Sequence, residues 1–423
     1  MHKISVPQNI SKFTLYSMLF GTNLPLLKIS AVNFRVGYVL ILAFFFSLIA
    51  LKYRLAIKDK NLYLLATFHL ALLLNVFFAE FPVLHLKQYF LIALFSMLYI
   101  QLLISYQCCG LNNKSVTRII TVSAYLISAI SFSYAAYSLY TSNNVFLAWG
   151  NFKGTFAERN ELATFVVYLI GFMIPLVLYK SNENYFGHTL AFFLLFSTLL
   201  FNMSRGSIVA FVFQFILTTM LFYLNNIKFN ITKNLRIIIL LLVILSLMFF
   251  TALKKYDFEK FSAIFWGRIF VFGTSKDATG IIRLNTIQDT LNIFIEKSVT
   301  GFSGFGLGNI GYYLQSYTNQ NVSRYALLPK FELATSSNII NDTLFETGGS
   351  GIISLFLLAS LPSFNLVRKL KHQNGDDKLF SIGALCSFWG LVISGLSYNT
   401  FYIIFFWSAL AFISISSQNF GEN

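Results

Sequence analysis

Apolar segments long enough to cross a lipid bilayer recur along almost the whole chain. A bilayer core about 30 Å thick needs roughly 20 mainly apolar residues per helix. The sequence supplies such windows repeatedly, with 56% hydrophobic and only 11% charged residues. A signal peptide or a single anchor would account for one such window. We therefore predict an integral membrane protein of the all-α polytopic class.

The apolar windows predict about twelve transmembrane helices. Pro25 interrupts the first window, which makes it the weakest. The windows cover residues 13–31, 36–53, 61–79, 89–106, 117–140, 161–179, 185–202, 206–224, 236–253, 338–361, 380–396 and 399–417.

Lysine and arginine residues gather in short segments between these windows. With twelve spans, all the segments fall on one side of the membrane, which the positive-inside rule assigns to the cytoplasm together with both termini. They comprise Lys52, Arg54, Lys58 and Lys60; Lys114 and Arg118; Lys228, Lys233 and Arg236; and Arg368, Lys369, Lys371 and Lys378. Three parts follow: an N-terminal bundle of about nine spans over 1–253, a large extracytoplasmic loop over 254–337, and about three spans over 338–423.

The formal net charge of +15 raises the question of a nucleic-acid partner. Because the charges sit at the ends of spans, topology and anionic lipid headgroups explain them. We expect membrane lipid, and no nucleic acid, as a partner.

Charged residues are also predicted at the outer face of the membrane. A charge at the centre of a span costs about 2.5 to 3.5 kcal/mol on the insertion scale, so such residues need a polar interior to face. The candidates are Lys153, Glu158, Arg159 and Glu161 in GNFKGTFAERNELATF, Arg205 in FNMSRGSIVAF, and Arg283 in the long loop. For Arg205 the alternative is an arginine that reaches only to the lipid headgroups.

The segment SSNIINDTLFETGGSG, residues 336–351, carries polar groups into a predicted span. If the helix begins near 338, Asn338, Asp342 and Glu346 lie one turn apart on one face with Asn341 beside them, while Thr343 and Thr347 lie elsewhere. We expect this face to contact protein or water. The alternative is a capping box formed by Thr343 and Glu346, with Asp342 complementing the helix dipole.

An amphipathic helix of about 15 residues with Arg283, followed by a glycine-rich loop, is predicted within the long loop. Gly306, Gly308 and Gly311 match GxGxxG. No strand precedes them and no acidic residue follows at the ribose position, so we interpret these glycines as turn formers and exclude a dinucleotide site.

Three segments in this order resemble the O-antigen ligase and polymerase family: GTFAERNELA at 154–163, SRGSIVA at 204–210, and RLNTIQDTL through SSNIINDTLFETGGSGIIS from Arg283 to Ser354. The resemblance implies a GT-C-like membrane glycosyltransferase of the bacterial inner membrane, with its site facing the periplasm. In the ligase branch the last motif typically begins with His-Asn, and here Ser337 stands at the histidine position. The sequence is therefore more similar to Wzy-type polymerases.

The resemblance also implies the substrates. Donor and acceptor would be oligosaccharide repeat units on undecaprenyl pyrophosphate, joined with inversion into O-antigen or a related surface polysaccharide without metal or other cofactor, and a chain-length regulator protein is a conceivable partner. The family's paired arginines fall on Arg205 and Arg283. Candidate carboxylates are Glu158, Asp342 and Glu346, and candidate substrate-binding residues are Lys153, Arg159, Asn160, Ser337, Asn338 and Asn341. A ligase acting on a lipid or protein acceptor, and a transporter or lipid flippase, are the alternative functions.

Overall fold

A computed structural model describes a large part of the chain in detail. The described residues are 11–12, 15–16, 25–29, 32–35, 39, 41–43, 45–46, 60–142, 152, 156, 159–179, 185–202, 204–228, 278–297, 301–318, 338–397 and 404–418. Within them the elements are helices apart from one short hairpin. The chain is an all-α polytopic membrane protein, as predicted.

The long apolar helices match the predicted spans closely. Among the described residues, seven candidate membrane spans and two shorter apolar helices are present. The candidate spans are α3 with η1 (Lys60–Leu74, Asn75–Phe78), α4 (Pro82–Cys108), α5 (Asn113–Ser142), α7 (Arg159–Leu178), α9 (Arg205–Leu224), α15 (Ile339–Lys369) and α16 (Gly375–Gly395), and the shorter helices are α8 (Tyr185–Asn202) and α17 (Ile404–Ser417). The predicted span 236–253 and most of 36–53 lie outside the described residues.

The first predicted span, 13–31, is wrong over its second half. Residues Pro25–Ile29 form strand β1, which pairs antiparallel with β2 (Val32–Arg35). Pro25 stands at the head of β1, where a missing N–H disturbs a ladder least. A short apolar run does not by itself distinguish a strand from a buried helix, which explains the error.

The chain forms two compact units, each built from separated stretches of sequence. Unit 1 comprises Met1–Leu24, Gly110–Thr274 and Lys369–Ser394; unit 2 comprises Pro25–Cys109, Ser275–Arg368 and Gly395–Asn423. The three-part division by sequence order stays a prediction. Unit 1 contains α5, α7, α8, α9 and α16, and unit 2 contains the hairpin, α3, α4, α12 (Ala278–Lys297), α13 (Ile310–Thr318), α15 and α17.

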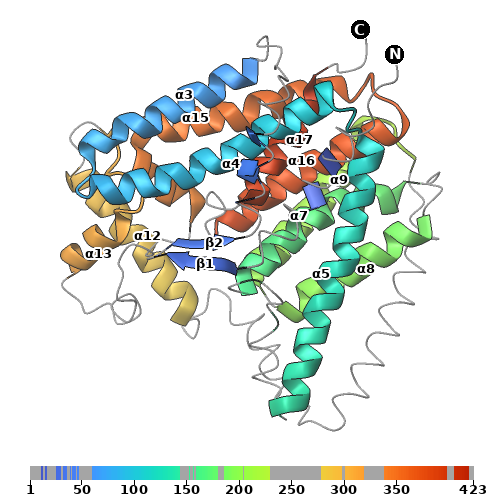
Figure 1. The fold of residues 1–423 in the computed structure, drawn as a ribbon, viewed down its shortest axis with the longest axis horizontal. Helices are drawn as coiled ribbons and strands as arrows, with labels where there is room; N and C mark the ends of the chain where they lie inside the picture. Colours follow the sequence, from blue (N-terminus) through green and yellow to red (C-terminus); the bar gives the residue numbers. More distant parts are fainter. Residues whose placement is uncertain are drawn as a thin grey trace. The chain divides into compact units, whose positions relative to one another are not determined.

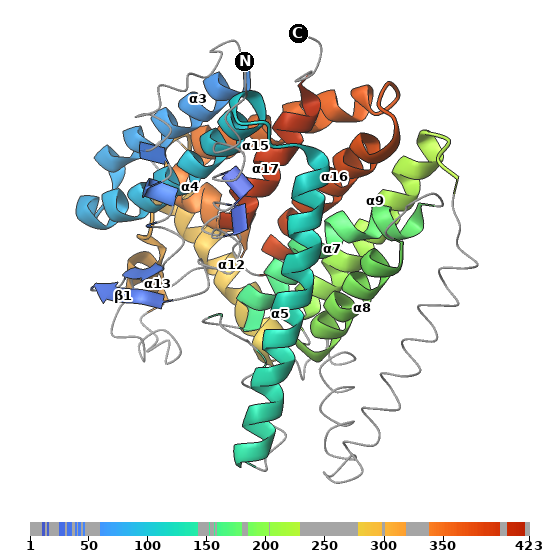
Figure 2. The ribbon, with the colours of Figure 1, turned by 45° about the vertical axis from the view of Figure 1, so that its right-hand side comes forward.

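Helix α7 forms the centre of unit 1, with α8 and α9 alongside it (Figures 1 and 2). The Gln214 amide on α9 links three helices, because its Nε2 donates to the Val167 carbonyl at 2.9 Å and to the Cys386 carbonyl at 3.1 Å. Ser207, near the start of α9, lies 3.3 Å from Ser394 at the end of α16, measured between hydroxyl oxygens. Helices α9 and α16 therefore run antiparallel.

In unit 2, α4 packs along α17, and the Tyr99 hydroxyl donates to Ser414 Oγ at 2.8 Å. Helices α12 and α13 lie together and are joined through the glycine-rich loop, residues 301–309 (Figure 1). A buried apolar cluster fastens α12, the loop and α13 to α15; its members are Ile293, Phe294, Phe305, Ile310, Leu314 and Phe345.

Candidate functional site

At one end of unit 1, a buried asparagine joins the helices that carry the predicted basic residues. Asn202, the last residue of α8, donates through Nδ2 to the Arg159 carbonyl at 2.8 Å and to the Phe152 carbonyl at 3.4 Å. Only two residues separate α8 from Arg205 at the start of α9, so the predicted tight turn is confirmed. Arg159, Asn160 and Arg205, all half-buried, therefore lie at the same end of the bundle.

The sequence alone did not single out Asn202 as a site residue. It is 2% exposed, and its Oδ1 has no hydrogen-bond partner among the described residues. An unpaired amide oxygen in a buried site is costly unless something binds to it. The signal in the sequence was its position three residues before Arg205 at the end of an apolar span.

Lys153, Glu158 and Ser337 lie outside the described residues. Their proposed roles stay predictions.

In unit 2, Asn338 caps the polar helix α15. Its Oδ1 accepts from the N–H groups of Ile340 at 3.0 Å and Asn341 at 3.1 Å, and its Nδ2 donates to the Leu396 carbonyl at 3.2 Å. An asparagine in this position satisfies N–H groups that the first turn leaves without a helical partner. The alternative capping box is wrong, because the Thr343 hydroxyl donates to the Ile339 carbonyl instead.

The polar face of α15 is buried in protein, as predicted. Asn341, Asp342 and Glu346 are 5%, 1% and 2% exposed, whereas Ile340 is 52% exposed. Thr343 and Thr347 are buried as well, because the glycine-rich loop covers a second side of the helix. Both amide atoms of Asn341 lack a hydrogen-bond partner within the described part of the chain.

The backbone of the glycine-rich loop forms hydrogen bonds with α15 where that helix is interrupted. Gly348 has a φ of +66°, which interrupts the helical hydrogen bonds around it. The carbonyls of Phe345 and Glu346 accept instead from the loop N–H groups of Phe305 at 2.9 Å and Gly306 at 3.0 Å. In turn, the N–H groups of Gly349 and Ser350 donate to the loop carbonyls of residues 301 and 302, each at 3.0 Å. Two lost helical bonds are thus replaced by four bonds to the loop.

Side chains from three elements hold this loop in place. The Glu346 carboxylate accepts from the Gly308 N–H at 2.8 Å. This predicted catalytic residue therefore helps to hold the loop against α15. Asn75 accepts from the Gly304 N–H at 2.8 Å and donates to the Thr347 carbonyl at 3.0 Å.

Two further contacts complete the attachment of the loop. The Nδ1 atom of fully buried His85 accepts from the Leu307 N–H at 2.8 Å, so the neutral ring carries its proton on Nε2. The Asn309 side chain accepts from the Phe81 N–H at 2.9 Å. Sequence reasoning singled out none of Asn75, His85 and Asn309.

Two of the three GxGxxG glycines act as turn formers, as predicted, whereas Gly311 lies within α13. Gly306 and Gly308 have φ values of +89° and +75°, a region that residues with a side chain rarely adopt. A Cβ atom at Gly304 would collide with the backbone of Glu346 and Thr347. The loop therefore needs glycine both for its turns and for its close approach to α15.

Arg283 lies on the packed face of α12, a 20-residue helix somewhat longer than predicted. Arg283, Thr286, Thr290 and Ile293 follow one another at spacings of three or four residues, and the last three are buried. Arg283 is half-buried on the same side, toward the cluster that joins α12 to α15.

Helix α13 contributes an aromatic hydroxyl to the edge of the same cluster. The Tyr313 ring packs against Phe305 with ring centroids 4.6 Å apart. Burial, followed by the nearby Glu80 carboxylate, raises the pKa of Tyr313. Its hydroxyl is therefore a hydrogen-bond donor at neutral pH.

The two predicted arginines belong to different units, Arg205 to unit 1 and Arg283 to unit 2. Their convergence on one substrate stays a prediction.

A comparison with protein families identifies the region that holds these features. Residues 190–356 match the model of the O-antigen ligase family. This region is similar to the O-antigen ligase family. The matched range runs from α8 through Arg205, Arg283 and the glycine-rich loop to the middle of α15. A comparison with curated proteins found no match. The family match supports an O-antigen ligase- or polymerase-type activity, that of a membrane glycosyltransferase-like enzyme.

Proposed function

We propose that this protein polymerises oligosaccharide repeat units carried on undecaprenyl pyrophosphate into O-antigen or a related surface polysaccharide. The observation that carries the proposal is the family match itself, because residues 190–356 contain both arginines and the buried acidic face of α15. Polymerisation is favoured over ligation because Ser337 replaces the histidine that the ligase branch typically has. The site faces the periplasm in the predicted topology.

The proposed reaction is an inverting glycosyl transfer. A sugar hydroxyl of the acceptor chain attacks the anomeric carbon of the donor, and a new glycosidic C–O bond forms. The bond from that carbon to the pyrophosphate oxygen breaks, and its electron pair leaves with undecaprenyl pyrophosphate. The hydroxyl proton passes to a carboxylate, for which we favour Asp342 on the buried polar face of α15.

The two arginines are proposed to stabilise the leaving pyrophosphate. Guanidinium groups bind phosphate oxygens in a bidentate manner, and fixed donors aimed at a developing negative charge lower the barrier of such a step. Pyrophosphate is already a good leaving group, so the proposal requires no metal. Lys153, Arg159 and Asn160 would hold a second phosphate or a sugar, and the unpaired amide of Asn341 would bind a sugar hydroxyl.

Reconstitution tests this function. The purified full-length protein in liposomes is supplied with synthetic lipid-linked repeat units, with and without EDTA, and the products are resolved by size. We expect a ladder of longer lipid-linked chains that EDTA leaves unchanged. Transfer of the glycan only to a lipid or protein acceptor would assign a ligase, and passage of the substrate into sealed vesicles without chain growth would assign a transporter.

A deletion strain separates the two enzyme functions independently. Loss of a polymerase leaves surface glycan of a single repeat, because single repeat units are still transferred to the final acceptor. Loss of a ligase leaves long chains on the polyprenyl carrier. We expect the first pattern.

A further inference from the structure

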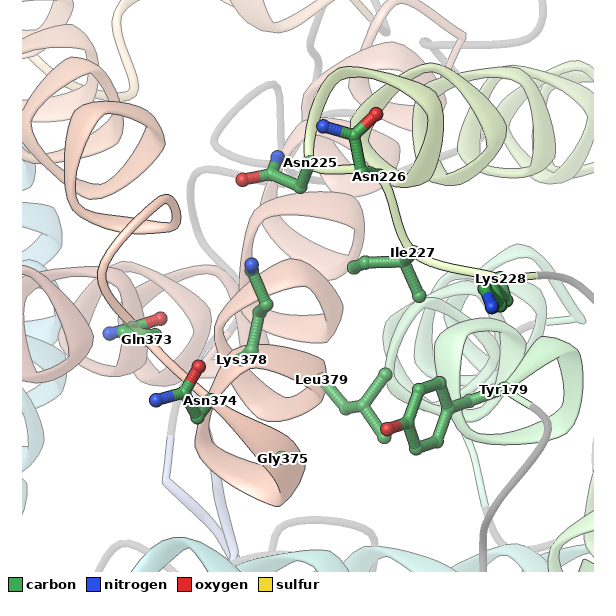
Figure 3. Close-up of a pocket in the computed structure, with 10 residues that line it drawn as sticks. All are labelled: Tyr179, Asn225, Asn226, Ile227, Lys228, Gln373, Asn374, Gly375, Lys378 and Leu379. Carbon is green, nitrogen blue, oxygen red and sulfur yellow. The ribbon is translucent and has the colours of Figure 1, made fainter.

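A cavity of about 590 Å³ opens at the end of unit 1 opposite to Arg205 (Figure 3). Helix α9 begins at Arg205, beside the end of α16, and its other end reaches the cavity. The lining comes from three places: Tyr179 after α7, residues 225–228 after α9, and, around the start of α16, Gln373, Asn374, Gly375, Lys378 and Leu379. All of them belong to unit 1. The volume lies within the range of small-ligand sites.

The charge of the lining is positive. Lys228 and Lys378 contribute to it, and no carboxylate is among the lining residues. Figure 3 shows Lys378 extending from α16 toward Asn225. The nearby Asp377 carboxylate accepts from the Asn113 side chain at 2.7 Å, away from the cavity lining. Helix α16 begins at Gly375 in the lining, so the positive end of its dipole adds to the two ammonium groups.

Beside this cavity, backbone hydrogen bonds to carbonyls of its last turn close the end of α9. Asn226 adopts a φ of +52°, and the chain closes the helix with bonds from the Asn226 N–H to the Tyr223 carbonyl at 3.2 Å and from the Ile227 N–H to the Phe222 carbonyl at 2.9 Å. Asn225 donates through Nδ2 to the Leu221 carbonyl at 2.8 Å.

The lining contains a buried acceptor on Asn225. The Asn225 Oδ1 atom has no hydrogen-bond partner among the described residues. A ligand that satisfies the whole lining therefore combines an anion for the lysines with a hydrogen-bond donor for this oxygen.

We propose that this cavity binds the headgroup of an anionic phospholipid that carries hydroxyl groups, as glycerol phosphate headgroups do. The two lysines pair with the phosphodiester oxygens, and Asn225 Oδ1 accepts from a headgroup hydroxyl. The cavity lies at the ends of membrane-spanning helices, which is the depth of lipid headgroups; in the predicted topology this is the cytoplasmic leaflet. An ethanolamine headgroup fits less well, because its ammonium group would face both lysines. This site is separate from the glycan-transfer chemistry proposed at the other end of the bundle.

A titration tests the proposal. The full-length protein in neutral detergent is titrated with short-chain phosphatidylglycerol, and the rise in its unfolding temperature gives an apparent affinity. We expect saturable stabilisation that weakens at least tenfold in Lys378→Gln and in Lys228→Gln. Lys371→Gln is the matched control, since Lys371 is exposed on the same connection but does not line the cavity. If Lys378→Gln fails to fold, the test relies on Lys228→Gln, because Lys228 is exposed.

Three outcomes would overturn the assignment. Equal weakening by Lys371→Gln would mean general surface electrostatics. Equal affinity for phosphatidylethanolamine would remove the roles of net charge and hydroxyl. Equal affinity for glycerol phosphate or inorganic phosphate would make the ligand a soluble phosphate compound instead of a lipid. Much weaker binding of both soluble phosphates supports a lipid.

Discussion

The polar residues of the two units are held in place by different means. In unit 1, Arg159 and Arg205 stand at the starts of helices α7 and α9, and the Asn202 side chain links the end of α8 to the start of α7. In unit 2, the acidic face of α15 is enclosed by a loop whose backbone replaces the helical bonds that Gly348 breaks. Helix ends are fixed by the packing of long apolar surfaces, whereas the loop depends on a few individual hydrogen bonds.

The two units should therefore respond differently to substitutions of their polar residues. Substitutions in unit 1 should act mainly through the charge that they remove. Substitutions in unit 2 should also act through the loop, even where the altered residue carries no charge and touches no substrate.

The largest effect is expected at the two arginines. In Arg205→Lys and in Arg283→Lys the charge remains but the bidentate fork is lost. Loss of one comparable donor costs about 2.7 to 4 kcal/mol in the barrier, so chain growth should fall by about two to three orders of magnitude. The polysaccharide ladder of a complemented deletion strain measures this, with membrane insertion checked by immunoblot. Arg368→Lys on exposed Arg368 of α15 is the control and should retain the full ladder. Full-length polysaccharide from both site variants would refute their role.

A comparison of the two carboxylates on α15 gives an effect of similar size. Asp342→Asn removes the proposed proton acceptor, and general base catalysis typically contributes about 10² to 10⁴ in rate. Glu346→Gln retains an oxygen that accepts from the Gly308 N–H, so we expect a loss of at most about tenfold. Single-turnover rates in liposomes distinguish the two. The reverse order would make Glu346 the base.

Asn75→Leu tests the attachment of the loop. The substitution leaves the Gly304 N–H buried without its partner, which costs about 1 to 3 kcal/mol, and removes one of the two side-chain hydrogen bonds to the Thr347 carbonyl. We expect a clearly lower unfolding temperature in detergent together with reduced chain growth, although Asn75 carries no charge. A stable but inactive variant would point instead to direct contact of Asn75 with the substrate.

The polar groups of both units were predictable from the sequence to different degrees. Asp342 and Glu346 stood out because charges are scarce in apolar spans, and their spacing assigned them to one helical face. Asn75 and His85 gave no such signal. Each bonds to a backbone N–H more than 200 positions away, 229 for Asn75 and 222 for His85. Because nearly every residue has a backbone N–H group, the sequence does not indicate which of them a side chain will bind.

The break in α15 was only partly predictable. Three glycines in this span, Gly348, Gly349 and Gly351, are typical of close approach by a neighbouring helix. The neighbour is the glycine-rich loop. Similarly, hydropathy recognised the apolar run before residue 31 but not that Pro25–Ile29 forms a strand.

A smaller effect is expected at Asn341, which differs from Asn75 in having no partner for its amide within the described residues. Asn341→Leu keeps the approximate shape and removes an unsatisfied polar group, so the unfolding temperature should stay the same or rise. If the amide binds a sugar hydroxyl, the KM for lipid-linked repeats should rise about tenfold, the value of one hydrogen bond of about 1.4 kcal/mol. Unchanged kinetics would remove Asn341 from the substrate site.

The smallest effect is expected at Gln214, although it links three helices in the middle of unit 1. Its two acceptors are helix carbonyls, which keep their own helical N–H partners when the side chain is removed. At Asn75, by contrast, the Gly304 N–H has no second partner among the described residues, although the Thr347 carbonyl also accepts from the Ser350 hydroxyl at 3.2 Å. Gln214→Met fills a similar volume, so we expect a loss of about 0.6 kcal/mol, typical of interhelical hydrogen bonds in membranes, and unchanged chain growth. A loss as large as that of Asn75→Leu, measured by the same thermal unfolding, would show that unit 1 too depends on single hydrogen bonds, and the contrast between the units would fail.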